Sequence, residues 1–265
     1  MLGSLSPARR RFVVGLVVLA CVAVAAVVVA VLASGDDDVR PVAQDRPGPV
    51  LLVPGYGGST ASLQVLRDAL AVGSRTAQIV TPAGSGTQDL RDQAADLGRA
   101  VDEVLEETGA DSVDLVGYSA GGVVVRIYVA DLGGGSKVRR AVTLASPHHG
   151  TDLAAAAGSL GGEACPEACE QLDPDSDLLR ELNADDETPA GPAWVALWTE
   201  DDKTVVPPAS GSLDGALDFS VQSVCPGVSL GHADVPRSPT VAVMVESVLT
   251  PSAPRLPSPS VCSSG

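Results

Sequence analysis

Between residues 50 and 250, short apolar runs alternate with longer stretches in which apolar residues recur every three or four positions. Short continuous runs of Val, Leu and Ile are typical of parallel strands that are buried on both faces. The helical spacing is clearest at 88–108, where Leu90, Leu97 and Val104 fall on one stripe. The pattern predicts strands at 50–53, 79–80, 113–116, 138–144, 194–199 and 219–224, and helices at 61–72, 88–108, 123–131, 176–182 and 240–249.

This alternation predicts an α/β fold, with a roughly six-stranded, mostly parallel sheet and helices on both faces. We assign the domain to residues 50–250, a length that suits one compact unit. Residues 34–49 are polar and contain three prolines, which is typical of a linker. The tail at 251–265 is rich in Pro and Ser, and we expect it to be disordered. Apart from the helix predicted at 176–182, the stretch 151–192 is poorly periodic.

The segment from Phe12 to Ala33 contains 22 residues and no charge. A helix of about 20 apolar residues is long enough to cross the hydrocarbon core of a bilayer. Three arginines lie before the segment and three aspartates after it. By the positive-inside rule, residues 1–11 are then cytoplasmic, and 12–33 anchors a single-pass cell-membrane protein whose domain lies outside. The alternative is a signal peptide cleaved near 31–33, which would make the protein secreted.

The charge of the chain is strongly acidic and unevenly distributed. Seventeen Lys and Arg face 33 Asp and Glu, so the formal net charge is −16. This balance argues against a nucleic-acid partner, because binding to a phosphate backbone needs a concentrated positive field. The first 35 residues hold three arginines and no acid, which leaves 14 − 33 = −19 for the rest. The arginines therefore act as a topology signal, and most of the acids are expected to be solvated.

Export changes the interpretation of the cysteines. Cys21 lies in the apolar segment, whereas Cys165, Cys169, Cys225 and Cys262 lie in the exported part. Four cysteines in an oxidising compartment allow three pairings, and the sequence does not choose among them. A zinc site at the first pair is disfavoured because no histidine is close by and the spacing stands alone. We predict no metal and no cofactor.

Residues 117–121 read G-Y-S-A-G and match the pattern G-x-S-x-G. A predicted strand leads into this motif and a predicted helix leaves it. Strand, sharp turn and helix together form the nucleophile elbow of the α/β-hydrolase fold, in which the serine oxygen is exposed above the sheet. Ser119 is therefore the candidate nucleophile.

A serine nucleophile needs a base and an acid that orients the base, and in this fold they follow the serine in the order acid, then histidine. His148 and His149 precede every suitable acid, which leaves His232 as the candidate general base and acid. Asp202, after the predicted strand at 194–199, is the candidate orienting acid, with Asp201 as the alternative. Its role would be to hold the imidazole tautomer and stabilise the imidazolium.

The tetrahedral intermediate of acyl transfer also needs two N–H donors for its oxyanion. One is predicted to be the backbone N–H of Ala120, directly after the nucleophile. The other should come from the loop after the first strand, at 54–58. Within this loop the N–H of Tyr56 is the first choice and that of Gly57 the alternative.

Several segments together resemble small bacterial α/β-hydrolase lipases and esterases, of the triacylglycerol-lipase type without a large cap domain. They are P-G-Y-G-G at 54–58, G-Y-S-A-G-G at 117–122, A-S-P-H-H-G-T at 145–151, the Asp202 segment and His232, and they span about 50–250. One departure is Pro54, because such lipases usually carry a histidine there.

The resemblance also implies roles for the regions around the triad. His148 and His149 would shape the wall of the site, and residues 151–192 would partly cover it, as lids do. A disulfide from Cys165 or Cys169 to Cys225, which two of the three pairings contain, would tie this covering segment to the His232 loop.

The expected function is that of an extracytoplasmic serine ester hydrolase, a lipase or esterase that cleaves lipid acyl esters through an acyl-enzyme. Its expected partners are a lipid or other ester substrate and the membrane, the latter through the N-terminal segment, and we expect a monomer. Two alternatives remain open: an acyltransferase or thioesterase on the same triad, and an inactive membrane-tethered binding protein on a hydrolase scaffold.

Overall fold

The computed structural model describes residues 18, 20–22, 24, 39–71, 75–160 and 164–263. Arg40–Gly265 forms a compact unit of its own. Among the described residues, no helix has the length and apolar character needed to cross a membrane. The span expected at 12–33 lies, except for residues 18, 20–22 and 24, outside the described part of the chain.

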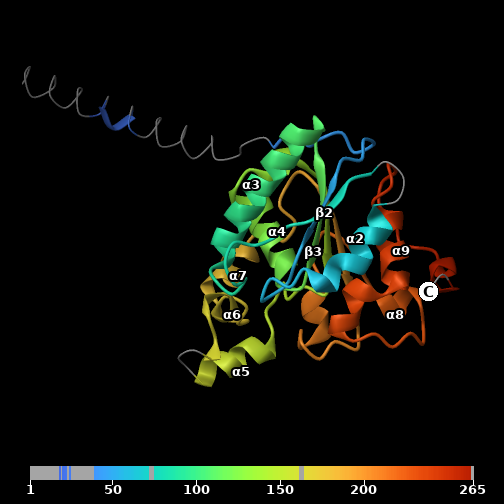
Figure 1. The fold of residues 1–265 in the computed structure, drawn as a ribbon. Coiled ribbons are helices and arrows are strands. Elements are labelled where there is room, and N and C mark those ends of the chain that lie inside the picture. Colours follow the sequence, from blue (N-terminus) through green and yellow to red (C-terminus); the bar gives the residue numbers. More distant parts are fainter. Residues whose placement is uncertain are drawn as a thin grey trace, which may run out of the picture. The chain divides into compact units, whose positions relative to one another are not determined.

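Six parallel strands form a single sheet in the order β2-β1-β3-β4-β5-β6 (Figure 1). Each predicted strand is present, although the ends differ by a few residues. The chain crosses from β1 over β2 back to β3, so the strand order reverses beside β1 and β3. In open parallel sheets, ligands bind at the carboxyl ends of the strands near such a reversal. The strands are β1 (Val50–Val53), β2 (Ala77–Ile79), β3 (Val113–Tyr118), β4 (Val138–Leu144), β5 (Ala193–Trp198) and β6 (Leu217–Ser220).

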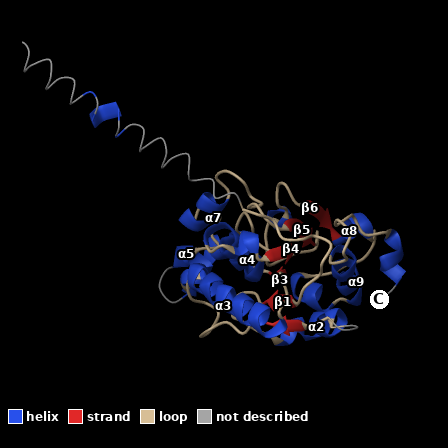
Figure 2. Ribbon diagram, turned by 90° about the horizontal axis from the view of Figure 1, so that it is seen from above, coloured by secondary structure: helices blue, strands red, loops and turns tan. Residues whose placement is uncertain are grey.

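Helices cover both faces of this sheet (Figure 2). A separate apolar core fills the space between the sheet and the helices on each face. Residues of α3 and α4 belong to one core, and residues of α2 and α9 belong to the other. The fold is therefore the predicted α/β-hydrolase arrangement. The helices are α2 (Gln64–Leu70), α3 (Leu90–Thr108), α4 (Ala120–Asp131), α5 (Asp152–Leu160), α6 (Glu167–Glu170), α7 (Asp177–Leu182), α8 (Val221–Val224) and α9 (Pro239–Val248).

The structure differs from the sequence pattern in two places. The predicted strand 219–224 ends at Ser220, whose side chain accepts a hydrogen bond from Ser223 N–H and caps α8. The stretch 151–192, in which one helix is predicted, also contains α5 and α6. The first change follows from a capping hydroxyl within an apolar run, which hydropathy alone does not reveal.

The structure contains two disulfides, which correspond to one of the three pairings that the sequence allows. Cys165 pairs with Cys169, and Cys225 pairs with Cys262. The bridge considered between the covering segment and Cys225 is therefore not formed. The second disulfide attaches the tail, which we expected to be disordered, to the end of α8. In that tail Pro259–Ser263 forms a short 3-10 helix with Val261 buried.

At the opposite end of the sheet from the strand carboxyl ends, Asp114 of β3 is fully buried and forms ion pairs with Arg75 and Arg139. Arg139 binds the carboxylate of Asp114 in a bidentate manner, at 2.9 Å from Nε to Oδ1 and 2.5 Å from Nη2 to Oδ2. The same guanidinium donates to the carbonyls of Leu249, at 2.7 Å, and Gln44, at 3.1 Å. The ion pair thus holds two segments against the sheet, the one before β1 and the one after α9. Burial lowers the pKa of Arg139 to about 10, which leaves it charged at neutral pH.

We predict that Asp114→Asn lowers the free energy of unfolding by about 3–5 kcal/mol, because the buried guanidinium of Arg139 loses its counter-charge. Asp111→Asn is the matched control, since Asp111 and its partner Arg46 are both exposed. That change should cost less than about 1 kcal/mol. Urea unfolding of the three proteins measures both effects, and similar midpoints for all of them would contradict the prediction.

Candidate active site

Ser119 lies at the sharp turn between β3 and α4, where its backbone is held at φ 54° and ψ −129°. A non-glycine residue with positive φ is strained by about 1–3 kcal/mol and needs support from its surroundings. Ser119 N–H donates to Leu144 O at 2.8 Å, and Gly122 N–H donates to Ser119 O at 3.0 Å. The turn is also tightly packed, because a Cβ at Gly117 would lie 2.5 Å from Gly121 O. The motif therefore forms the predicted elbow.

The structure brings Ser119, His232 and Asp202 into one hydrogen-bonded chain. His232 Nε2 lies 3.0 Å from Ser119 Oγ, and His232 Nδ1 lies 2.7 Å from Asp202 Oδ2. Ser119 follows β3, Asp202 follows β5, and His232 begins the 3-10 helix His232–Arg237 after β6 and α8. Parallel strands present their carboxyl ends at the same edge, which explains how residues more than a hundred positions apart meet here.

Of the two neighbouring aspartates, only Asp202 contacts the histidine. Its side chain is 2% exposed, and its other oxygen, Oδ1, accepts from Thr204 N–H and Val205 N–H at 2.8 Å each. Asp201 instead accepts from Leu230 N–H at 3.1 Å. Hydrogen bonds from Leu230 N–H and the Ser229 side chain lower the pKa of Asp201. The geometry thus favours Asp202 for the orienting position and gives Asp201 a different task, that of holding the loop before His232.

Two further contacts fix the position of the histidine. Tyr118 Oη donates to His232 O at 3.1 Å, and the two rings lie 5.2 Å apart. Thr199 Oγ1 donates to Leu230 O at 2.6 Å. Tyr118 and Thr199 are not among the candidate residues predicted from the sequence, although each is close in sequence to one of them.

The loop predicted to supply an oxyanion donor packs directly on the nucleophile. A Cβ at Gly55 would lie 2.8 Å from Ser119 Cβ, so only glycine permits this approach. Gly57 N–H is already used, because it donates to Gly86 O at 3.0 Å. Among the described residues, the N–H groups of Tyr56 and Ala120 have no hydrogen-bond acceptor. Of the two loop candidates, Tyr56 is therefore the better donor.

An apolar pocket of about 170 Å³ opens beside Ser119. Its walls come from the loop after β1, the loop after β4, the helices α5 and α6, and the loop after Asp202. Its volume is smaller than the 300–1,000 Å³ typical of ligand pockets. The residues that line it are Tyr56, Ser119, Pro147, Thr151, Leu153, Ala154, Cys169, Leu172, Thr204 and Val205.

His148 and His149, which were expected in the wall of the site, do not line this pocket, whereas the preceding Pro147 does. His148 is fully buried, with Nε2 3.0 Å from Thr143 Oγ1. Burial, with smaller contributions from Arg126 and His149, holds the pKa of His148 well below 6.5. His149 lies 2.8 Å from Glu187 Oε1. Both residues brace the loop after β4 rather than contact the pocket.

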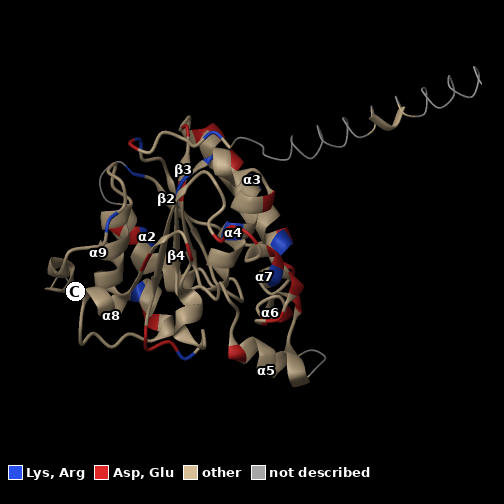
Figure 3. Ribbon diagram, turned by 180° about the vertical axis from the view of Figure 1, so that it is seen from behind, with Lys and Arg blue, Asp and Glu red and all other residues tan. Residues whose placement is uncertain are grey.

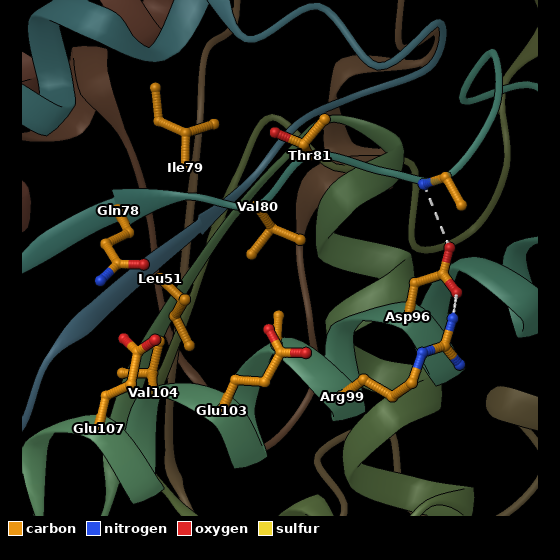
Figure 4. Close-up of a pocket in the computed structure, with 12 residues that line it drawn as sticks. Leu51, Gln78, Ile79, Val80, Thr81, Asp96, Arg99, Glu103, Val104 and Glu107 are labelled. Carbon is orange, nitrogen blue, oxygen red and sulfur yellow. Dashed lines mark hydrogen bonds and ion pairs between the residues drawn. The ribbon is translucent and has the colours of Figure 1, made fainter.

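A larger hollow of about 390 Å³ lies between β2 and α3 (Figure 4). Its lining is more polar, with Asp96, Glu103 and Glu107 on α3 and Arg99 paired to Asp96. Figure 3 shows acidic segments along α3 and near α6 and α7, in keeping with a solvated acidic surface. Ser119, Asp202 and His232 do not line this hollow. In the described part of the chain, no group of three or more His, Cys, Asp or Glu side chains is placed to hold a metal ion.

Comparison with known families agrees with this geometry. Residues 49–184 match the family model described as palmitoyl protein thioesterase, which is just over half of the chain. The chain belongs to this family. The matched region includes Ser119 and the Tyr56 loop, and it ends before Asp202 and His232.

Solved lipases share the fold of this family member. Aspergillus fumigatus lipase B has a TM-score of 0.68 and 16% sequence identity, over 82% of this chain and 56% of that chain. The mature form of Bacillus licheniformis lipase BlEst2 has a TM-score of 0.62 and 18% identity, over 80% of this chain and 94% of that chain. This chain thus spans little more than half the length of the Aspergillus lipase. Together with the family match, these structures show that the chain has the α/β-hydrolase fold.

The buried His148 predicts a stability that depends on pH. Below pH 6.5 the unfolded state binds a proton that the folded state does not, so the free energy of unfolding falls as the pH drops. We expect a loss of about 1.4 kcal/mol between pH 7.5 and 5.5.

The His148→Gln variant provides the control, because it removes this titration. It should be less stable at every pH but should lack this component of the loss. Urea unfolding at several pH values tests the prediction, and the same pH dependence in both proteins would contradict it.

Proposed function

We propose that the protein is a serine hydrolase that transfers the acyl group of an ester or thioester to water. Ser119 is the nucleophile, His232 the general base and acid, and Asp202 the residue that orients His232. The observation that carries the proposal is the continuous hydrogen-bonded chain from Asp202 Oδ2 through His232 to Ser119 Oγ. The apolar pocket beside Ser119 supports an acyl group as the part of the substrate that is bound.

The reaction uses two acyl transfers. Ser119 Oγ attacks the acyl carbon while His232 Nε2 takes the hydroxyl proton, and the oxyanion accepts hydrogen bonds from Tyr56 N–H and Ala120 N–H. When the intermediate collapses, the bond from carbon to the leaving group breaks, and His232 gives the proton to the departing alcohol or thiol. Water then attacks the acyl-enzyme by the same route. Asp202 stabilises the imidazolium and keeps its own negative charge.

The nature of the leaving group separates two candidate activities. Resemblance to lipases favours an oxygen ester, with lipid esters as the substrate class. The family match to palmitoyl protein thioesterase gives specific support to the second candidate, a thioester. We place the oxygen ester first, because the similar solved structures that cover most of this chain include two named as lipases.

We also propose that the domain works outside the cytoplasm. Two disulfides among the exported cysteines support this placement, since disulfides persist mainly in oxidising compartments. The apolar segment at 12–33 with its preceding arginines supports either a single-pass anchor or a cleaved signal.

Replacing the triad residues should abolish turnover without unfolding the protein. For Ser119→Ala, His232→Ala and Asp202→Asn we expect kcat on p-nitrophenyl butyrate to fall by about 10³-fold or more. Asp201→Asn is the matched control, because it keeps an oxygen for Leu230 N–H, and it should lose less than about tenfold. Steady-state kinetics of the full chain in detergent micelles measures these effects. A Ser119→Ala protein as active as wild type would refute the assignment.

A paired substrate experiment separates the ester from the thioester reading. Butyrylcholine and butyrylthiocholine differ only in the atom that leaves, and product formation from each is measured with the same protein. We expect a higher kcat/KM for the oxygen ester relative to each substrate's uncatalysed hydrolysis. The opposite order would establish the thioesterase alternative.

A further inference from the structure

The turn that carries Tyr56 N–H has the sequence G-Y-G-G and consists of glycines apart from Tyr56. Gly58 N–H donates to Gly55 O at 3.0 Å and closes the turn around Tyr56 and Gly57. Gly57 has a φ of 80°, which glycine adopts without strain. Pro54, which precedes the turn, has no N–H to donate. The position of Tyr56 N–H therefore depends on what packs around a turn that is itself made of the most flexible residue type.

Residues 82–88, between β2 and α3, pack against this turn. Gly86 O accepts a hydrogen bond from Gly57 N–H at 3.0 Å. Gly86 is buried, and a Cβ there would lie 2.5 Å from Gly58 N and 2.9 Å from the carbonyl carbon of Gly57. No side chain fits between the two segments, so they meet backbone to backbone.

The loop at 82–88 is itself attached to two helices. Asp96 of α3 accepts from Ala83 N–H at 3.2 Å (Figure 4). Thr87 O accepts from Ala168 N–H of α6 at 3.2 Å. Residues of both helices belong to the apolar core on this face of the sheet. The loop therefore connects the core to the turn that carries the oxyanion donor.

The side chain of Gln88 also closes this loop on itself. Its Nε2 donates to Ala83 O, and its Oε1 accepts from Thr87 N–H at 3.0 Å. These two bonds hold the chain on either side of Gly86 and so fix the position of the Gly86 carbonyl.

Resting on the proposed function, we infer that Gly86 is a positioning residue for the oxyanion donor Tyr56. One end of the turn packs against Ser119 through Gly55. The other end is bound by Gly86 through Gly57 N–H. Gly86 does not line the pocket beside the nucleophile, so it acts through the turn. Because a donor that is already in place stabilises the oxyanion without reorganisation, this contact contributes to the rate of acyl transfer.

Gly86→Ala tests the inference, because its methyl group would displace the turn. We expect kcat on p-nitrophenyl butyrate to fall by about 10²-fold, the loss that follows removal of one oxyanion donor, and KM to change by less than about threefold. Gly109→Ala is the matched control. Gly109 has a φ of 65°, against 70° for Gly86, but a Cβ there would meet no atom within 4 Å. The control thus has the same backbone strain and should keep the kcat of the wild type, and equal kcat values in the two variants would overturn the inference.

A trifluoromethyl ketone with a butyl chain separates the positioning of the donor from general damage to the fold. Ser119 Oγ adds to its carbonyl carbon, His232 takes the hydroxyl proton, and the carbonyl oxygen becomes the oxyanion, with no leaving group. We expect its Ki to rise by about 10²-fold in Gly86→Ala and to stay unchanged in Gly109→Ala. An unchanged Ki in Gly86→Ala would contradict the inference. A Ser119→Ala protein with undiminished turnover of the ester would refute the proposed function instead.

Thermal unfolding shows whether each variant is folded. If Gly86→Ala does not fold, Gln88→Ala loosens the same loop without placing an atom against the turn, and its kcat should fall by about fivefold at unchanged KM. Gln64→Ala is the control for this variant, because Gln64 is exposed and accepts from Arg67 on the surface of α2. A folded Gln88→Ala protein with the kcat of the control would then overturn the inference.

Discussion

The arrangement of the site depends on one strained residue, Ser119, held between β3 and α4 at a positive φ. An isolated chain would relax this conformation, at a gain of about 1–3 kcal/mol. The fold prevents this because β3 is central in the sheet and α4 packs closely on it, with glycines where any side chain would collide. This backbone conformation places Oγ at the carboxyl ends of the strands, within 3.0 Å of His232 Nε2.

The second constraint concerns Ser119, Asp202 and His232, which lie in loops after different strands. Asp202 and His232 are positioned by hydrogen bonds with residues outside this group of three. Asp202 is fixed by two backbone N–H groups, and the His232 loop is held through Asp201, Thr199 and Tyr118. Such outer contacts fix the geometry before substrate arrives, and this preorganisation is the main source of electrostatic stabilisation in enzymes. Of the two neighbouring aspartates, Asp202 thus contacts the imidazole and Asp201 holds the loop before it.

Much of the fold followed from local pattern, because continuous apolar runs are hard to satisfy except as buried parallel strands. The elbow, His232 and the preference for Asp202 followed from chain order and strand context. The ordered tail did not, since it depends on the meeting of Cys225 with Cys262, which are 37 residues apart. The helix α8 did not either, because it begins at the Ser220 cap, which hydropathy does not reveal. The wall of the pocket was missed because α5 and α6 are short and rich in alanine and acidic residues, with little periodicity.

The most direct test of the account is to locate the covalent adduct formed with a fluorophosphonate probe. Peptide mass spectrometry of the labelled full chain should place the phosphonate on Ser119, and labelling should become much slower in His232→Ala, because the hydroxyl then lacks its base. A modification at another serine, or equally fast labelling with and without His232, would contradict the central claim that these residues form one catalytic unit.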